Sequence, residues 1–400
     1  MTQTPDYVRE VLDILEAGGH KAWLVGGCLR DMLLDRTVHD WDIATSARGA
    51  DIVPLFPKTV GTGARFGTIT VITGGGSVEV TTLRSDGVYS DRRRPDKVRF
   101  VDDLLEDLKR RDFTINAMAM TAGGELSDPF DGQGDLKRRL IRCVGQPEDR
   151  FSEDALRMFR ALRFSAQLGF DIEAGTMAAI RKCAGLCAAL SAERVRDETE
   201  KILMSPGPEL VGTAVEYGLC AGRMEKAALP VEDLKRLAAL PLEKQLRWAA
   251  FCAVILRAGL IESAREFLCA MRLDAKAVKN CGTGAIAAFD APLPADRTGL
   301  KRLLSEIGSD AGRCAAAADE ALRGGDAVRR IGEVISGGEC FSLKELAVSG
   351  GDLMAIGVKP GKQMGGMLRA LLEHVIDHPE KNIRTTLLNL AERIRPETQG

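Results

Sequence analysis

Two aspartates separated by one residue, in "HDWDIAT" (39–45), form the pattern in this chain with the clearest chemical meaning. If this stretch is a strand, Asp40 and Asp42 project from the same face because side chains alternate, and Trp41 points the other way into packing. Two carboxylates held so close repel each other unless a cation lies between them, and hard oxygen ligands suit Mg²⁺. A D-x-D pair alone is more often a loop or surface feature, so the metal interpretation needs support from other residues.

Two glycines and an arginine upstream supply that support. Gly26 and Gly27 stand where a short apolar run passes into a helical pattern over 27–35. Glycines leave backbone N–H groups accessible, and a helix N-terminus favours an anion. Arg30 lies on the first turn of the same helix. With the carboxylates, these residues provide a phosphate cradle, a cation for a triphosphate and a metal pair, which nucleotidyl transfer by in-line attack requires.

The elements that position these residues follow from hydrophobic periodicity. Over the first 140 residues, helical patterns alternate with strand-like runs, and from Pro147 on only Ala/Leu/Arg/Glu-rich helical patterns remain. The helical patterns are 5–17, 27–35 and 102–111, and the strand-like runs are KAWLV (21–25), DIATS (42–46), GTITVIT (67–73) and SVEVTTL (77–83). The sequence predicts an α/β (α+β) head followed by an all-α remainder.

Composition narrows the class of protein. Four hundred residues with 45% hydrophobic content suffice for two or three domains. The apolar runs are too short for a membrane span and the first residues are acidic, so we expect a cytosolic protein with no membrane partner. Ten cysteines without a repeated C-x-x-C favour reduced, buried thiols over disulfides or a zinc site.

The net charge of −2 excludes a uniformly basic nucleic-acid binder, but basic residues cluster locally. The clusters are RRR (92–94), KRR (109–111) and KRR (137–139). Each alone is more simply explained as a solvated face, and together they could hold a polyanion locally.

The stretch SEDALRMFRALRF (152–164) begins with acids and continues with arginines. Ser152 is a candidate N-cap, and Glu153 and Asp154 suit the positive end of a helix. Asp154 and Arg157 are three residues apart, so an ion pair on one helix face is a second structural explanation. The residues alone favour these explanations over base recognition.

Four stretches together resemble one family. They are LVGGCLRDMLLDRTVHDWDIAT (24–45), VEVTTLRSDGVYSDRRRPDKVRFVDDLLEDLKRRDFTINAMAM (78–120), DPFDGQGDLKRRLIRCVG (128–145) and RFSEDALRMFRALRFSAQLGF (150–170). They closely resemble the class II tRNA nucleotidyltransferases, the CCA-adding enzymes of the polymerase-β superfamily. The resemblance covers about residues 20–205 and continues more faintly in SGGDLMAIGVKPGKQMGGMLRALLEHV (349–375).

The resemblance implies a set of site residues. Asp40 and Asp42 would be the catalytic Mg²⁺ ligands, and Glu79 is a candidate third carboxylate unless it pairs with an arginine such as Arg84. Asp154 and Arg157 would pair with the incoming base in place of a template, which reverses the preference stated above. The implied nucleotide contacts are Gly27, Arg30, Arg111, Asp154, Arg157, Arg160 and Arg163. At 100° per residue Arg163 lies about half a turn from Asp154, so we expect Arg160 and Arg163 to serve phosphates, a neighbouring acid or the turn of the pocket.

The resemblance also implies an architecture and partners. We expect a catalytic head with a mixed sheet (1–140), a nucleotide-reading neck (141–205), a helical body (206–290) and a helical tail (291–400). The tail would hold the tRNA acceptor arm through phosphates and 2′-hydroxyls. The substrates would be CTP and ATP, added as CCA to the tRNA 3′ end.

Alternative functions stay open at this point. The intact loop SDGVYSDRRRP (85–95) favours complete CCA addition or A addition over C addition alone. A poly(A) polymerase would usually carry a more basic C-terminal region. A non-catalytic RNA-binding protein is disfavoured by the complete carboxylate pair, and a small-molecule nucleotidyltransferase leaves the long helical tail without a use.

Overall fold

The computed structural model describes residues 4–63, 67–86, 98–220 and 223–394. The chain forms two compact units by its internal contacts. The first contains Met1–Glu198 with Tyr217–Gly222, and the second contains Thr199–Glu216 with Arg223–Gly400. Each unit has its own core and is described separately.

A seven-stranded mixed sheet organises the first unit, in the order β3-β4-β5-β2-β1-β8-β9. Its strands are β1 (Ala22–Val25), β2 (Trp41–Thr45), β3 (Thr59–Gly63), β4 (Thr68–Ile72), β5 (Ser77–Thr82), β8 (Ala119–Met120) and β9 (Leu126–Ser127). β2 and β5 run parallel, and the other neighbours run antiparallel. The mixed sheet and the four expected strands are confirmed. β3, β8 and β9 were missed because they are either glycine-rich or only two residues long.

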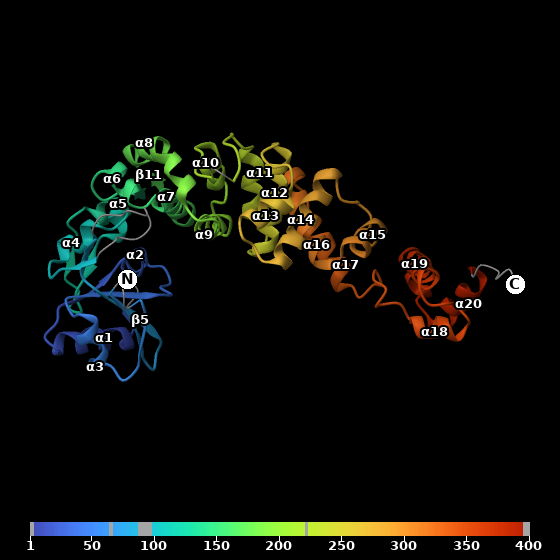
Figure 1. Ribbon diagram of the computed structural model, residues 1–400, viewed down its shortest axis with the longest axis horizontal. Coiled ribbons are helices and arrows are strands. Elements are labelled where there is room, and N and C mark those ends of the chain that lie inside the picture. Colours follow the sequence, from blue (N-terminus) through green and yellow to red (C-terminus); the bar gives the residue numbers. More distant parts are fainter. Residues whose placement is uncertain (1–3, 64–66, 87–97, 221–222, 395–400) are drawn as a thin grey trace. The chain divides into compact units, whose positions relative to one another are not determined.

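Helices α1 (Asp6–Ala17) and α3 (Gly49–Leu55) lie side by side against the sheet (Figure 1). The buried residues of α1 include Val8, Val11, Leu12 and Leu15, which follow the spacing of one helix face. They share a core with apolar side chains of β1, β2, β4 and β5, including Trp41. This core fixes the sheet whose opposite side chains reach the candidate site.

The short helix α2 (Gly27–Leu33) connects β1 to the loop before β2. The later elements, up to the boundary with the second unit, cover 84–203. These are β6 (Arg84–Asp86), β7 (Val98–Phe100), α4 (Leu104–Lys109), η2 (Thr114–Asn116), α5 (Gly132–Arg138), β10 (Leu140–Ile141), α6 (Pro147–Glu153), α7 (Leu156–Leu168), β11 (Asp171–Ile172), α8 (Ala174–Cys183), η3 (Ala184–Ala189) and α9 (Ala192–Leu203), the last of which continues into the second unit. Residues 87–95 of the expected loop 85–95 lie outside the described residues.

The stretch expected to form one helix from Ser152 is instead divided between two. Pro147 starts α6 earlier, so Ser152 lies inside that helix and the N-cap prediction is wrong. Asp154 has extended backbone angles (φ −142°, ψ 105°) and separates α6 from α7. Asp154 therefore does not share a helix with Arg157, which the ion pair considered from the residues alone would require.

The second unit is all-α, as predicted. Its helices are α10 (Leu210–Glu216), α11 (Val231–Arg236), η4 (Leu237–Ala239), α12 (Lys244–Arg257), α13 (Ala264–Ala270), α14 (Ala275–Asp290), α15 (Arg297–Ile307), α16 (Ser309–Arg323), α17 (Ala327–Ser336), α18 (Gly350–Ala355), α19 (Lys362–Asp377), η5 (Pro379–Lys381) and α20 (Arg384–Ile394). α12, α14 and α16 pack against one another, and a separate apolar cluster joins α18, α19 and α20. The boundaries at 140, 205 and 290 stay predictions; α14 and α16, on either side of residue 290, are in contact.

Arg247 is a buried cation of the second unit. Its guanidinium donates to the carbonyl oxygens of Leu203 (2.7 Å) and Leu240 (2.8 Å), and at longer range to those of Ser205, Ala238 and Pro241. Burial lowers the pKa of Arg247. One side chain thus ties together the backbone before α10 and the backbone between η4 and α12.

All ten cysteines are free thiols, and most are buried. Within the described ranges, no helix has the length and apolar character needed to cross a membrane.

Candidate active site

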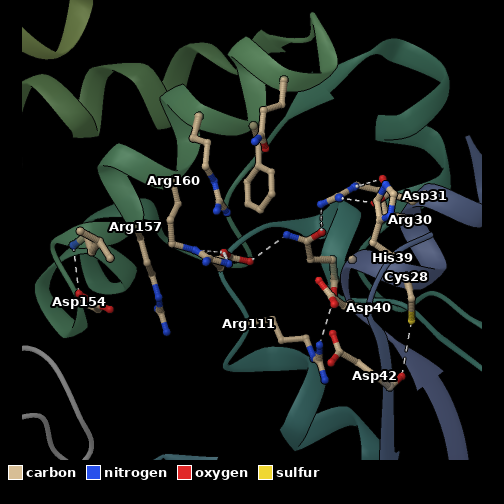
Figure 2. Close-up of a pocket in the computed structure, with 18 of the residues that line it drawn as sticks. Cys28, Arg30, Asp31, His39, Asp40, Asp42, Arg111, Asp154, Arg157 and Arg160 are labelled. Atoms are coloured by element: carbon tan, nitrogen blue, oxygen red, sulfur yellow. Dashed lines mark hydrogen bonds and ion pairs between the residues drawn. The ribbon is translucent and has the colours of Figure 1, made fainter. Parts of the chain in front are cut away.

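A cavity of about 710 Å³ in the first unit contains all nine residues expected from the sequence to form the site. They are Gly27, Arg30, Asp40, Asp42, Arg111, Asp154, Arg157, Arg160 and Arg163. Figure 2 shows Asp40, Asp42 and Arg111 gathered at one end of the cavity, with Asp154 and Arg157 away from them. The cavity therefore has a carboxylate end and an end near α7.

At the carboxylate end, Asp42 lies on β2 and Asp40 immediately precedes that strand. Glu79 on β5 is the register partner of Asp42. Burial first, and then the charges of Glu79 and Asp40, raise the pKa of Asp42 to about 6 against the opposing charge of Arg111. An excess of negative charge thus collects at this edge of the sheet, which is a suitable environment for a cation.

The backbone around Gly26 brings a cation close to these carboxylates. Gly26 has φ +73°, which glycine adopts without strain, and a Cβ placed there would lie 3.2 Å from Nη1 of Arg111. The same Cβ would lie 3.6 Å from Oδ2 of Asp42. Asp107 holds Arg111 in place, with Nη2 of Arg111 donating to Oδ2 of Asp107 at 3.0 Å. A side chain at Gly26 would therefore crowd Arg111 and would strain the backbone at this positive φ.

A chain of hydrogen bonds runs from Arg30 to Arg160. Nη1 of Arg30 donates to Oδ1 of Asn116 (2.9 Å), Nδ2 of Asn116 donates to Oδ1 of Asp112 (3.2 Å), and Nε of Arg160 donates to Oδ2 of Asp112 (2.7 Å). Burial would raise the pKa of Asp112, but the charge and hydrogen bond of Arg160 outweigh it and lower the pKa to about 2. Asp112 is therefore an ionised link between α2 and α7.

At the α7 end, Asp154 and Arg157 have different partners. Oδ1 of Asp154 accepts from the backbone N–H of Leu156 (3.0 Å), and Oδ2 accepts from Nη2 of Arg194 (2.7 Å). Nη1 of Arg157 donates to Oε2 of Glu153 (2.6 Å). No ion pair joins Asp154 to Arg157 among the described contacts, so the helix ion pair considered from the sequence is not formed. Each side chain is oriented separately.

Three guanidinium groups surround one aromatic ring deeper in the cavity. Arg163 lies 4.3 Å from the centroid of Phe164, Arg30 lies 5.0 Å away and Arg160 lies 5.3 Å away. Nε of Arg163 is 3.2 Å from Oε2 of Glu198, and burial lowers the pKa of Arg163 to about 10 despite that charge. Arg160 and Arg163 thus each face a neighbouring acid, one of the roles expected for them.

The basic clusters differ in how far they are neutralised. In 109–111, Arg110 and Arg111 both pair with Asp107, whose pKa burial would raise and these two cations lower. In 137–139, Arg138 pairs with Asp131 and Asp135. The cluster at 92–94 lies outside the described residues.

The sequence analysis assigned no role to several other residues that line the cavity, among them Asp112, Asn116 and Arg194. Asp112 and Asn116 belong to RRDFTINA (110–117), where their polar types within an apolar stretch were an available signal. Arg194 lies in a charged helical pattern (SAERVRDETE, 191–200) that gives no indication of a site.

Comparison with protein families finds three matching models along the chain. "Poly A polymerase head domain" matches residues 22–142, "Probable RNA and SrmB- binding site of polymerase A" matches 169–222, and "tRNA nucleotidyltransferase domain 2" matches 243–391. The first model contains both carboxylates and Arg111.

Relatives match over nearly the whole chain. The CCA-adding enzyme of Limosilactobacillus fermentum is 39% identical over 396 residues, which cover 96% of this chain and 95% of that protein. The CCA-adding enzyme of Geobacillus kaustophilus is 38% identical over 394 residues, covering 94% of each. The crystal structure of the Bacillus stearothermophilus CCA-adding enzyme in complex with CTP superposes with a TM-score of 0.82 at 33% identity, covering 98% of both chains.

Proposed function

The chain belongs to the family of CCA-adding enzymes, and on that premise we propose that it adds C, C and A to the 3′ end of tRNA from CTP and ATP. The observation that carries the proposal is the single cavity that contains the carboxylate pair, Arg30, Arg111 and the separately oriented Asp154 and Arg157. Such a cavity has groups for a metal, a triphosphate and a base together.

Nucleotidyltransferases of this family are typically metal-dependent. Asp40 and Asp42 fit a divalent cation because burial and neighbouring carboxylates already raise the pKa of Asp42, so a bound cation relieves unfavourable charge. Asp40 and Asp42 would be the protein ligands of Mg²⁺, an ion that takes carboxylate oxygens and usually keeps water or substrate phosphate oxygens as its other ligands. A bound Mg²⁺ supplies Lewis acidity at the reacting phosphate and neutralises charge on the leaving pyrophosphate.

Positive charge for the triphosphate comes from Arg30 and Arg111. Arg111 lies beside Asp42, held by Asp107, so its charge stands next to the metal ligands without having to reorganise during the reaction. Arg30 is held by Asp31 and Asn116, at the start of the helix that Gly27 begins. We assign Gly27, Arg30 and Arg111 to the triphosphate.

The base is assigned to Asp154 and Arg157. Cytosine and adenine present an exocyclic amine beside a ring-nitrogen acceptor, and a carboxylate beside a guanidinium complements that pattern. Arg157 uses three of its N–H donors on Glu153 and on backbone carbonyls, which leaves two of the five that a guanidinium offers. Arg160 and Arg163 shape the cavity around Phe164 and add positive charge close to the nucleotide.

The second unit is assigned to tRNA. The family model that matches 243–391, within this unit, is a tRNA nucleotidyltransferase domain. An enzyme that acts on every tRNA must contact the phosphates and 2′-hydroxyls of the backbone, because sequence-specific contacts to bases would exclude some tRNAs.

One assay tests the function. The full chain is incubated with Mg²⁺ and tRNA ending at the discriminator base, with CTP, ATP or both, and the products are sized to single-nucleotide resolution. We expect two added nucleotides with CTP alone and three with both. Addition of a single A to tRNA that already ends in CC, without C addition, would indicate an A-adding enzyme, and long A tracts would indicate a poly(A) polymerase. Absence of any addition would contradict the proposed function.

A further inference from the structure

Arg194 is a residue of the cavity with no role in the assignments above. It lies on the first turn of α9, and its Nη2 donates to Oδ2 of Asp154 at 2.7 Å. The side chains of Arg194 and Asp154 are 19% and 17% exposed, so this ion pair is largely shielded from solvent. Charge-assisted hydrogen bonds of this kind are stronger and better oriented than exposed ones.

The two bonds to Asp154 fix the orientation of its carboxylate. Oδ1 is held by the N–H of Leu156 and Oδ2 by Arg194, so both oxygens are anchored from the protein side. Asp154 lies in an extended link between two helices, where no helix backbone constrains its side chain. Arg194 is the side chain that holds this carboxylate as an acceptor facing the cavity.

The other terminal nitrogen of Arg194, Nη1, is buried and has no hydrogen-bond partner among the described residues. A buried donor without a partner is unfavourable, and it favours any ligand atom that can accept from it. Arg194 therefore combines a donor used by Asp154 with a second, unused donor in the same guanidinium.

We infer that Arg194 is the positioning residue that makes Asp154 select bases with an exocyclic amine, an inference that rests on the proposed function. With Arg194 in place, the carboxylate oxygens accept from the N4 amine of cytosine or the N6 amine of adenine. Uracil O4 and guanine O6 are acceptors, and they face carboxylate lone pairs. Without Arg194 the carboxylate can rotate away, and the penalty against uracil and guanine decreases.

The same geometry predicts a reversal when Asp154 is removed. Asp154→Ala deletes the carboxylate and leaves the Arg194 guanidinium as a donor next to the base. A donor at that place complements O4 of uracil and opposes the amine of cytosine. Asp154→Ala should therefore invert the preference for CTP over UTP, and Arg194→Met in the same background should abolish the inverted preference.

The experiment compares kcat/KM for CTP and for UTP on tRNA ending at the discriminator base. We expect Arg194→Met to lower the CTP:UTP ratio at least about 10-fold, the change that loss of one oriented base contact produces. Arg194→Lys retains a cation for Asp154 and should restore much of the ratio. Asp154→Ala should favour UTP, and the double variant Asp154→Ala/Arg194→Met should show no preference. Arg196→Met, on the same helix and paired with Asp197, is the matched control and should keep the wild-type ratio.

The ratio separates positioning from a merely structural role, because partial unfolding lowers both rates equally. The inference is overturned if Arg194→Met keeps the wild-type CTP:UTP ratio. It is also overturned if Asp154→Ala and the double variant have the same ratio as each other. If Arg194→Met yields no folded protein, the CTP:UTP ratios of Arg194→Lys and Asp154→Ala are compared with that of the wild type. The inference is overturned if both variants keep the wild-type ratio. A wild-type enzyme that adds no C to tRNA contradicts the proposed function instead.

Discussion

Replacing Asp112 with Asn tests whether the buried charge between Asn116 and Arg160 stabilises the first unit. The substitution keeps the size of the side chain, and the hydrogen bond between residue 112 and Asn116 can form again. The buried guanidinium of Arg160, however, then faces a neutral amide in place of a carboxylate. A pKa of about 2 in place of 3.8 corresponds to about 2.5 kcal/mol of stabilisation at neutral pH. Breaking a buried ion pair typically costs about 3–5 kcal/mol, so we expect a loss of about 3 kcal/mol.

The stabilisation depends on pH in a defined direction. Because the pKa of Asp112 is lower in the folded state, its contribution is fully present above the ordinary value near 4 and is lost as the pH falls towards 2. The difference between wild type and Asp112→Asn should therefore be about 1 kcal/mol smaller at pH 3 than at pH 7.

The assay is urea unfolding followed by tryptophan fluorescence. Of the three tryptophans, Trp23 and Trp41 lie in the first unit and Trp248 in the second, so a Trp248→Phe background reports on the first unit alone. We expect Asp112→Asn to lower the midpoint by roughly 1 M urea. Asp102→Asn is the control, because its ion pair with Arg48 is exposed and should contribute little. Equal midpoints for wild type and Asp112→Asn at pH 7 would refute the reasoning.

Three further predictions concern catalysis, tRNA binding and the second unit. Asp40→Ala or Asp42→Ala should abolish addition of both C and A while tRNA affinity in a filter-binding assay stays near wild type; C addition by either variant would contradict a single metal site. The logarithm of tRNA affinity should fall linearly with the logarithm of the salt concentration. A chain that ends at residue 337 keeps α12, α14 and α16 complete, and it should bind tRNA more weakly than the full chain. An unchanged affinity would show that α18 to α20 have another role. Arg247→Met should destabilise the second unit by about 3 kcal/mol, because it leaves buried carbonyl oxygens without a donor. Urea unfolding with Trp248 as the fluorescent probe measures this loss. A loss below about 1 kcal/mol would mean that water replaces the guanidinium.

The sequence was sufficient for those parts of the fold that local pattern determines. The period-2 runs at β2 and β5 and the helical face of α1 were visible because one side of each is buried in a single core. The two-residue strands β8 and β9 were not visible, because they form by pairing with β1 and with each other and are too short to show a periodic pattern. The break at Asp154 was not visible either, because it follows from the early start of α6 at Pro147.

For the candidate site, the residue types near β2 were predictable from the sequence, and the long-range partners were not. Asp40, Asp42 and Arg30 could be proposed from residues close together in the chain. Arg194 stands 40 residues from Asp154, and only the folded chain brings the two together. The base-recognition assignment of Asp154 and Arg157 depended on family resemblance, since their residue types alone favoured a helix ion pair that the structure does not contain.

The crowding of Asp40, Asp42 and Glu79 has a consequence for directed evolution. A pKa of about 6 at Asp42 means that keeping this carboxylate ionised at neutral pH costs the metal-free fold about 3 kcal/mol. Asp42→Asn removes the buried charge itself, and Glu79→Gln removes only the smaller part of the cost that comes from repulsion, so both should raise the melting temperature in the absence of divalent cations. A library selected only for heat resistance in a chelating buffer would therefore enrich neutral residues at these positions first. Selection for a robust catalyst from this scaffold has to score nucleotide addition in every round.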